Sequence, residues 1–264
     1  MDSGKPTALI TGASFGIGLE LARIFAREKH NLVLVARTGD KLRQLASELE
    51  KAHGTRSLVL AVDLTEPGSP AYIFDQTARA GIPVDVLVNN AGFGQYGLFV
   101  ENDLEQCLKQ IQLNITTLTH LTRLYLPEML QRKSGRILNV ASTAAFQPGP
   151  LMAVYFATKA YVLHFSEALA NELAGSGVTV TCLCPGATAT EFHKRANATA
   201  MRLLGMGTMD ARTVAEDGYR ALIAGKPVVI SGFKNWAIAQ SVRFSPRKLV
   251  TAIARATQES KRTE

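Results

Sequence analysis

Short apolar runs rich in Val, Ile and Leu recur along the chain, and longer stretches with helical spacing separate them. Each apolar run is continuous rather than alternating, which is typical of strands covered on both faces. The predicted strands span residues 7–11, 31–36, 57–62, 84–90, 135–142, 178–184 and 227–230. The predicted helices span residues 16–29, 39–52, 69–80, 103–132, 152–174 and about 210–224.

Strand and helix alternate through nearly the whole chain, which predicts an α/β fold. We expect a doubly wound parallel sheet of the Rossmann type, with about seven strands and helices on both sides. No repeat, linker or break in composition precedes about residue 233. The prediction is therefore a single nucleotide-binding catalytic domain over residues 1–233. A basic amphipathic segment, residues 234–264, follows it and packs on the domain or on a partner.

Composition agrees with a folded globular chain, because 47% of the 264 residues are apolar and 19% are charged. No apolar run reaches the roughly 18 residues that suggest a membrane span. The start, "MDSGKPTALITGAS", leaves no room for a signal peptide before the first predicted strand. We expect a cytoplasmic or membrane-peripheral protein.

The cysteines and histidines show no spacing typical of a metal site. We expect Cys107, Cys182 and Cys184 to be small core residues, and no bound metal.

Most of the net charge of +7 lies in the C-terminal segment, where seven basic residues accompany two acidic ones. The nearly neutral remainder disfavours a nucleic-acid partner. The segment has two interpretations. It is either an interfacial stretch that meets anionic lipid, or a pair of short helices packed on the domain or on a neighbouring subunit.

The first strand runs into "TGASFGIG", which contains Gly12, Gly16 and Gly18 and opens a helix. Glycines let the backbone turn sharply and approach a ligand, and a helix N-terminus attracts phosphate. This loop predicts a pyrophosphate site, although a glycine-rich turn that binds nothing has the same pattern.

The second strand ends in "ARTGDKL", with Arg37 and Thr38 at its end and Lys41 a turn later. An acidic residue at this place would hold the ribose of NAD, whereas a guanidinium can bind the 2′-phosphate of NADP. The pattern favours NADP. The alternative is a solvent-exposed arginine at a helix start.

The third and fourth strands end in "VDLT" and "NNAG". Asp63 could accept from an adenine amino group, with Leu64 supplying a backbone N–H; alternatively Asp63 or Thr65 caps a helix. The small residues of 89–92 would let a cofactor lie against the sheet edge, and Asn89 could tie neighbouring strands together.

Tyr155 and Lys159 are four residues apart in a predicted helix, which places them on one face. An adjacent ammonium favours the phenolate and lowers the pKa of a tyrosine, making it a better acid near neutral pH. Ser142 ends the fifth strand. Asn114 lies midway in a long helix, where a polar residue in an apolar stripe needs a reason.

These segments together resemble the short-chain dehydrogenase/reductase family, in the branch marked by TGxxxGxG and YxxxK. The matching pieces are "TGASFGIG", "ARTGDKL", "VDL", "NNAG", Asn114, Ser142, "YFATK" and "PGATAT", in the family's order over residues 5–192. The resemblance implies an NADP-dependent oxidoreductase that transfers hydride between nicotinamide and a carbonyl or alcohol.

The resemblance also implies roles for four catalytic residues. Tyr155 is the acid in reduction or the base in oxidation, and Ser142 donates to the substrate oxygen. Lys159 binds the nicotinamide ribose, and Asn114 holds a water that links Lys159 to solvent.

The segment "PGATAT" would shape the nicotinamide pocket. The implied cofactor-binding residues are Gly12, Ser14, Phe15, Gly16, Ile17, Gly18, Arg37, Thr38, Asp63, Leu64, Asn90, Ala91, Gly92, Tyr155, Lys159, Pro185, Gly186, Thr188 and Thr190. Phe15 departs from the commoner Ser or Arg, so that Arg37 would carry more of the preference for NADP.

Three segments would enclose the substrate and are mostly apolar. The expected apolar lining is Phe93, Tyr96, Phe99, Phe146, Leu151, Met152, Met201, Leu203, Leu204 and Met206. The expected polar groups are Gln147, His193, Lys194 and Arg195. We therefore expect an apolar ketone or aldehyde: a lipid, steroid or aromatic carbonyl.

The family resemblance further implies a homodimer or homotetramer built on the helices at 103–132 and 152–174. A different function on the same fold is a regulatory protein that senses NADP(H) with little turnover. The complete set of four catalytic residues argues against that alternative.

Overall fold

A single seven-stranded sheet forms the centre of the computed structural model, which describes residues 4–191, 196 and 207–259. All strand pairs are parallel, in the order β3-β2-β1-β4-β5-β6-β7. The strands are β1 (Thr7–Thr11), β2 (Asn31–Ala36), β3 (Ser57–Ala61), β4 (Val86–Asn89), β5 (Gly135–Val140), β6 (Val178–Cys184) and β7 (Val228–Ile230). The predicted fold class and all seven predicted strands are confirmed.

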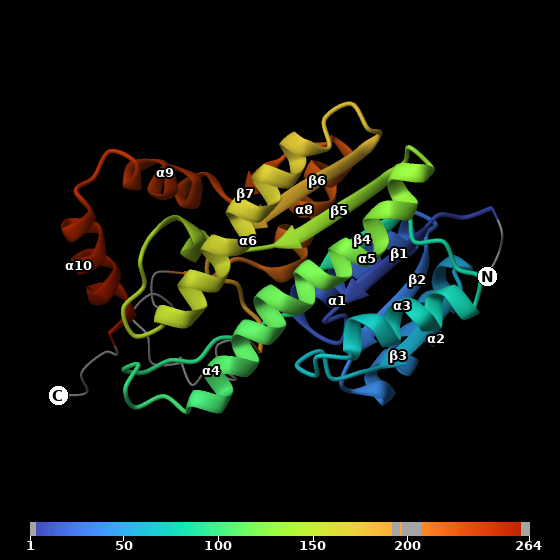
Figure 1. Ribbon diagram of the computed structural model, residues 1–264, viewed down its shortest axis with the longest axis horizontal. Helices are drawn as coiled ribbons and strands as arrows, with labels where there is room; N and C mark the ends of the chain where they lie inside the picture. The colour runs from blue at the N-terminus through green and yellow to red at the C-terminus, as the bar shows by residue number, and fades with distance from the viewer. Residues whose placement is uncertain (1–3, 192–195, 197–206, 260–264) are drawn as a thin grey trace.

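Helices cover both faces of the sheet (Figure 1). They are α1 (Gly16–Arg27), α2 (Gly39–His53), α3 (Ser69–Arg79), α4 (Leu104–Ile111), the π-helical turn η1 (Gln112–Thr117), α5 (Leu118–Gln131), the short η2 (Thr143–Phe146), α6 (Ala153–Glu172), α8 (Ala211–Ile223), α9 (Phe233–Val242) and α10 (Arg247–Gln258). One core cluster joins the sheet to α1, α2 and α8, and a second joins it to α3, α5 and α6.

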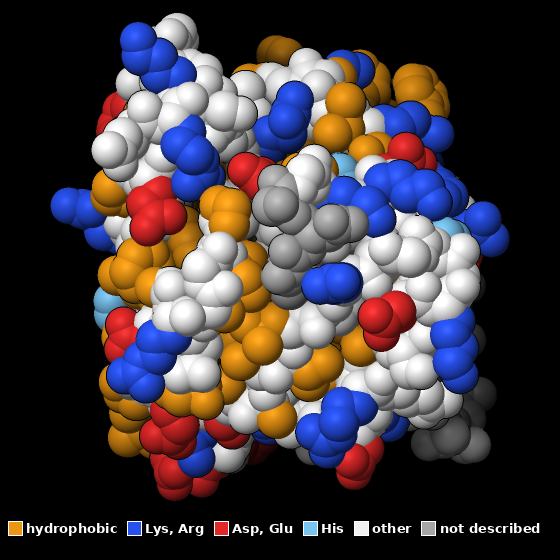
Figure 2. Space-filling view, turned by 90° about the vertical axis from the view of Figure 1, so that its right-hand side faces the viewer, with side chains coloured by type: hydrophobic (Ala, Val, Ile, Leu, Met, Phe, Trp, Pro, Cys, Tyr) orange, Lys and Arg blue, Asp and Glu red, His pale blue; other side chains and the backbone are white. Residues whose placement is uncertain are grey.

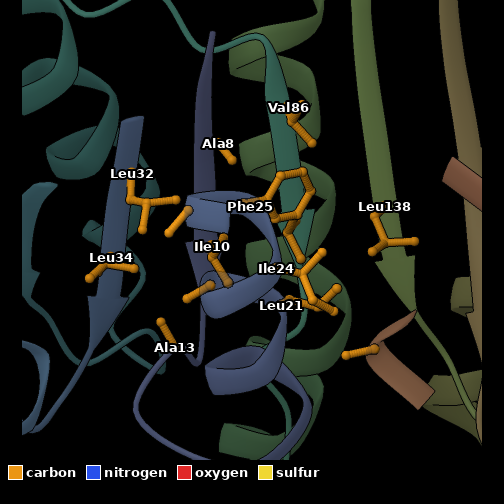
Figure 3. Packing of buried hydrophobic residues seen from close by; sticks show 14 of the residues in the cluster. Ala8, Ile10, Ala13, Leu21, Ile24, Phe25, Leu32, Leu34, Val86 and Leu138 are labelled. Atoms are coloured by element: carbon orange, nitrogen blue, oxygen red, sulfur yellow. The ribbon is translucent and has the colours of Figure 1, made fainter. Parts of the chain in front are cut away.

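Alternation along β1 shows how one strand supplies both cores. Ala8 and Ile10 belong to the cluster under α1, and Leu9 belongs to the cluster on the other face. Figure 3 shows Ala8 and Ile10 beside Leu21 and Phe25 of α1. Because both faces of the sheet are covered, the strands are continuously apolar, as the sequence pattern indicated.

The predicted helix at 103–132 is interrupted at its middle. Between α4 and α5 the chain makes the π-helical turn η1. An inserted residue of this kind shifts the face that later side chains present, and such turns are frequent at functional sites. Here it buries Asn114 and Thr117, and the Thr117 hydroxyl donates to the Leu64 carbonyl at 2.8 Å.

The C-terminal segment forms two helices, α9 and α10, which lie beyond the carboxyl ends of the strands (Figure 1). Their buried residues are Ala239, Val250, Ala254 and Gln258. The segment is therefore helical and partly buried over residues 233–258, whereas its contact with lipid or with a partner, and the domain boundary at residue 233, stay predictions. Within the described residues, no helix combines the length and the apolar character needed to cross a membrane.

The opposite side of the molecule, away from α9 and α10, carries mixed charges. Figure 2 shows Lys and Arg side chains interspersed with Asp and Glu side chains around apolar patches on this face. This mixture agrees with the nearly neutral body of the chain.

Candidate active site

The sheet order places β1 between β2 and β4, so that the chain winds outward from β1 in both directions. In such sheets ligands bind in the crevice at the carboxyl ends of the strands, beside the point where the winding reverses. A cavity of about 1070 Å³ lies there. Of the predicted site residues, those that line it are Gly12, Ser14, Phe15, Gly16, Ile17, Arg37, Thr38, Asp63, Leu64, Asn90, Ala91, Gly92, Ser142, Tyr155, Lys159, Pro185, Gly186, Thr188 and Thr190.

Two predicted site residues, Gly18 and Asn114, do not line the cavity. Gly18 lies behind the glycine loop, where a Cβ would come within 2.3 Å of the Gly12 carbonyl oxygen. Asn114 lies behind Gly92, where a Cβ would come within 3.1 Å of Asn114 Oδ1. Both residues therefore lie behind the cavity wall and contact the residues that form it.

The glycine loop has the shape that the sequence pattern predicted. Gly12 and Gly16 have φ of +69° and +54°, a region that favours glycine. A Cβ on Gly16 would also lie 2.7 Å from Thr190 Cγ2, which shows that Thr190 packs against the loop. The N-cap residue of α1, Phe15, makes no side-chain capping hydrogen bond, and a helix N-terminus beside a glycine loop is suited to a phosphate.

We expect Gly18→Ala to lower the free energy of unfolding by about 2 kcal/mol, because the added Cβ meets backbone that cannot move aside. Nucleotide binding should weaken as well, because the Gly12 carbonyl belongs to the loop. Chemical unfolding and fluorescence titration measure the two effects. Gly68→Ala is the control, since a Cβ there meets nothing within 4 Å and φ is −77°; equal effects of the two substitutions would contradict the prediction.

Charged side chains gather at the end of the cavity formed by β2 and β3. Arg37 is exposed and lines the cavity. Burial would raise the pKa of Asp63, but this pKa lies below its usual range because the amide and the hydroxyl of Thr65 donate to the carboxylate at 2.9 and 2.8 Å. The charge of Arg37 lowers the pKa of Asp63 further, by a smaller amount. Lys41 Nζ lies 3.9 Å from the centroid of the Phe15 ring, in a cation–π contact. Phe15 thus positions a second cation near the cavity.

Neither Asp63 nor Thr65 caps a helix, because α3 begins at Ser69 after Gly68. The capping alternative for these residues is wrong. Asp63 instead closes a turn with Thr65 and keeps its place in the cavity wall.

Polar side chains join the strand ends behind the cavity. Asn89 Nδ2 donates to Asn139 Oδ1 at 2.9 Å and thereby ties β4 to β5, as predicted. Asn90 Nδ2 donates to the Thr11 carbonyl at 2.9 Å and ties β4 to β1. These bonds fix the edge against which a flat ligand can lie.

Ser142 and Tyr155 meet at the inner end of the cavity. Ser142 is the N-cap of η2, where its hydroxyl accepts from the Ala144 amide at 3.1 Å. Tyr155 lies in the first turn of α6, and its hydroxyl is hydrogen-bonded to that of Ser142. Two hydroxyls that meet in this way can both donate to one oxygen atom of a ligand.

Lys159 lies one turn after Tyr155, as predicted, with its Nζ 5.8 Å from the centroid of the Tyr155 ring. The ammonium donates to the Val140 carbonyl at 2.8 Å. Burial lowers the pKa of Lys159 to about 8. In the chain alone, burial raises the pKa of Tyr155 to about 12 against the opposing hydrogen bond from Ser142. The lowering that we expect from Lys159 together with an oxidised nicotinamide stays a prediction.

The pKa of Lys159 predicts a stability that depends on pH. A lysine in the unfolded chain has a pKa of about 10.4. Below pH 8 Lys159 is charged in both states and the cost of burying the charge is present in full. Between pH 8 and 10 the folded chain releases this proton first, so Lys159 should contribute a rise of about 2 to 3 kcal/mol to the free energy of unfolding. Cys184 acts in the opposite direction over the same range, because its hydrogen bond with Cys182 and its burial raise the pKa of its thiol, so the contribution of Lys159 is the difference between the wild type and a variant without this lysine. Above pH 10 the raised pKa of Tyr155 acts in the opposite direction.

Urea unfolding of the wild type and of Lys159→Met across this pH range measures the effect. The rise should be missing from Lys159→Met and present in Lys226→Met, which removes an exposed lysine. Parallel curves for the wild type and Lys159→Met would contradict the shift.

Asn114 is held by three hydrogen bonds in the π-helical turn. Its Nδ2 donates to the Phe93 carbonyl and to Thr158 Oγ1, both at 3.0 Å, and its Oδ1 accepts from the Phe93 amide at 3.2 Å. Thr158 in turn donates to the Tyr155 carbonyl at 2.8 Å. Asn114 therefore joins the segment after β4 to the start of α6; its role in holding a water stays a prediction.

Of the residues predicted to line the substrate pocket, Phe93, Phe146, Gln147 and Met152 line the cavity. Tyr96, Phe99 and Leu151 do not line it, which corrects the prediction. The Tyr96 hydroxyl donates to the Gln258 carbonyl at 2.9 Å, and Phe99 is exposed in a turn. The remaining predicted residues lie outside the described part of the chain: His193, Lys194, Arg195, Met201, Leu203, Leu204 and Met206.

Sequence reasoning missed the contribution of the C-terminal helices to this cavity. The residues that line it from α9 and α10 are Phe233, Lys234, Asn235, Ile238, Ala239, Thr257 and Gln258. The apolar positions of this segment were visible in the sequence, but no local pattern indicates which surface a helix will cover.

The cysteines are buried free thiols, as predicted. Across residues 4–191, 196 and 207–259, no group of three or more His, Cys, Asp or Glu side chains is placed to hold a metal ion.

Comparisons with known proteins agree with the fold. A family model described as short chain dehydrogenase matches residues 6–201. The very-long-chain 3-oxoacyl-CoA reductase of Bos taurus is 37% identical over 192 residues, covering 71% of this chain and 61% of the relative. The chain matches only about 60% of the length of the first curated relatives.

Two solved structures have the same fold and are more than 30% identical. One is a short-chain dehydrogenase from Sphingobium yanoikuyae in complex with NADPH, with a TM-score of 0.80, 35% identity, and coverage of 90% of this chain and 94% of that chain. The other is the bulky-bulky ketone specific alcohol dehydrogenase from Comamonas testosteroni, with a TM-score of 0.76, 33% identity, and coverage of 90% and 92%. With the family model matching most of its length, this chain belongs to the short-chain dehydrogenase/reductase family.

Proposed function

We propose that the protein binds NADP(H) and transfers hydride between its nicotinamide and a carbonyl or alcohol. The observation that carries the proposal is the convergence of Ser142, Tyr155 and Lys159 at the inner end of a long cavity. The glycine loop, the start of α1 and Arg37 lie elsewhere along the same cavity. These residues fit a dinucleotide with a 2′-phosphate, and one structural neighbour is a complex with NADPH.

Bound NADPH would supply the hydride, and the residues of the chain would handle the proton. The hydroxyls of Ser142 and Tyr155 would donate to the substrate oxygen in place of their bond to each other. Tyr155 would then give its proton to that oxygen in reduction, or take it in oxidation. Lys159, moved from the Val140 carbonyl toward the ribose, would favour the phenolate that Tyr155 becomes.

Preference for NADP would depend on Arg37, with Lys41 as a second cation. A guanidinium can form two charge-assisted hydrogen bonds to one phosphate. Lys41 would add its charge from its place over Phe15. This arrangement replaces the basic residue that the family often has at the position of Phe15.

The substrate would be an apolar ketone, aldehyde or 3-oxoacyl compound. The described cavity wall near Tyr155 includes Phe93, Phe146, Met152 and Phe156. An aromatic and methionine lining suits a bulky or chain-like apolar group better than a polyol. Two relatives agree with this class by name, a very-long-chain 3-oxoacyl-CoA reductase and a ketone-specific dehydrogenase.

A homo-oligomer built on α4, α5 and α6 is part of the proposal. Leu104, Leu108 and Ile111 are exposed on α4, and Tyr161 is exposed on α6. Contact between two copies would cover these apolar side chains.

The test is oxidation of NADPH, followed by absorbance, against carbonyls graded from polyols to 3-oxoacyl thioesters and bulky ketones. Turnover that increases with apolar size supports the proposal, and efficient turnover of polyols alone would overturn the substrate class. NADPH binding without reduction of any carbonyl would instead favour a sensing protein.

A further inference from the structure

Helix α10 carries apolar residues on two different faces. Val250, Ala254 and Gln258 are spaced four residues apart and are buried against the protein. Leu249 and Ile253, also four apart, lie on another face and are 52% and 55% exposed. A helix packed only on its own domain needs one apolar face, so the second apolar face of α10 indicates contact with a partner outside the domain.

The turn before α10 and the start of α9 add exposed aromatic rings. Phe244, between the two helices, is 89% exposed. Phe233 and Trp236 are also exposed and stack on each other with ring centroids 5.7 Å apart. These rings and the outer face of α10 form what we call the α9–α10 surface: Phe233, Trp236, Phe244, Leu249 and Ile253.

The charges around this surface have almost a single sign. Residues 233–259 contain the basic Lys234, Arg243, Arg247, Lys248 and Arg255, whereas the only acid in this stretch of sequence is Glu259. Glu259 pairs with Arg255 at 3.2 Å. A second copy of the chain placed symmetrically on this surface would bring like charges together, so the complementary partner is anionic.

The same two helices form part of the cavity wall. Ile238 of α9 and Thr257 of α10 line the cavity, while Leu249 and Ile253 lie on the exposed face of α10. Figure 1 places both helices beyond the carboxyl ends of the strands, on the side away from α2 and α3. A flat partner on the α9–α10 surface would therefore lie next to the substrate end of the cavity.

We propose that the α9–α10 surface docks on an anionic lipid bilayer. Phe244, Leu249 and Ile253 enter the interface, and Arg247 and Lys248 meet the lipid head groups. Exposed apolar and aromatic side chains beside cations are the combination that such docking requires, because neither binds stably alone. Docking needs neither cofactor nor turnover, so its failure would leave the proposed reaction untouched.

The experiment is sedimentation of the full chain with vesicles of phosphatidylcholine alone or with about 30% phosphatidylserine. We expect binding to the anionic vesicles that falls as salt is raised. The double variant Leu249→Ser/Ile253→Ser should bind about tenfold more weakly, and so should Arg247→Glu/Lys248→Glu.

The matched control is Tyr72→Ser/Ile223→Ser, which removes two apolar side chains of similar exposure, 50% and 45%, from α3 and α8. It should bind vesicles as the wild type does. Circular dichroism and NADPH titration establish that each variant is folded.

Three outcomes would overturn the proposal. They are no binding of the wild type to anionic vesicles, equal loss of binding in the control, and unchanged binding in both α10 variants. If the α10 variants change only the oligomeric state, measured by light scattering, the surface is an interface between copies and the bilayer proposal is wrong.

Discussion

Replacing Tyr155 with Phe is expected to lower kcat by about 10³-fold, while the affinity for NADPH stays within about twofold. The substitution removes only the hydroxyl that is hydrogen-bonded to Ser142 and leaves the buried ring in place. Without that proton donor, the oxygen of the reduced carbonyl must take its proton from water. Stopped-flow or steady-state oxidation of NADPH with the best carbonyl measures the loss.

Tyr161→Phe is the control for this loss. Tyr161 lies on the same helix and has its own hydroxyl partner, Thr119 at 2.9 Å, but it is exposed outside the cavity. Its substitution should leave kcat unchanged. A Tyr155→Phe enzyme that retains more than about a tenth of the wild-type kcat would show that another group supplies the proton.

The second large effect is expected from Arg37→Asp, which should lower the preference for NADPH over NADH by about 10³-fold. Charge-assisted bonds to a phosphate contribute about 1.5 to 3 kcal/mol. The new carboxylate would also repel the 2′-phosphate and accept from the ribose hydroxyls of NADH. Fluorescence titrations with the two nucleotides give both Kd values without any turnover.

Arg56→Asp makes the same change of charge at an exposed position. Arg56 lies just before β3, at the amino end of the strand, whereas Arg37 lies at the carboxyl end of β2. It should leave the ratio of Kd values unchanged. Equal ratios for Arg37→Asp and the wild type would place the phosphate elsewhere. A loss in Lys41→Met alone would identify the cation held over Phe15 as its main partner.

The fold was predictable from the sequence because a doubly covered parallel sheet leaves a strong local signal. The strands of such a sheet are predominantly apolar, and β1 shows why, since Ala8, Leu9 and Ile10 are all buried. The site was predictable for a related reason. Its residues come directly after strands, and parallel strands bring their carboxyl ends to one edge.

Two features could not be predicted in the same way. They are the π-helical turn at Asn114 and the raised pKa of Tyr155 in the chain alone. A single inserted residue changes no local composition, although Asn114 in an apolar stripe was a signal that something was unusual there. The pKa of Tyr155 depends on how deeply the ring is buried and on its hydrogen bond with Ser142. Both are properties of packing between distant segments.

Residues inside and outside the matched family region line the cavity described above. The matched family region, residues 6–201, contains the glycine loop, Arg37 and the Ser142–Tyr155–Lys159 group, whereas α9 and α10 lie outside that region. Exchange of residues 233–258 would therefore rebuild one wall of the cavity without altering the proton-handling residues. The proton-handling residues and the wall formed by α9 and α10 thus come from different parts of the chain. The last two helices are the place where directed evolution of substrate range should begin.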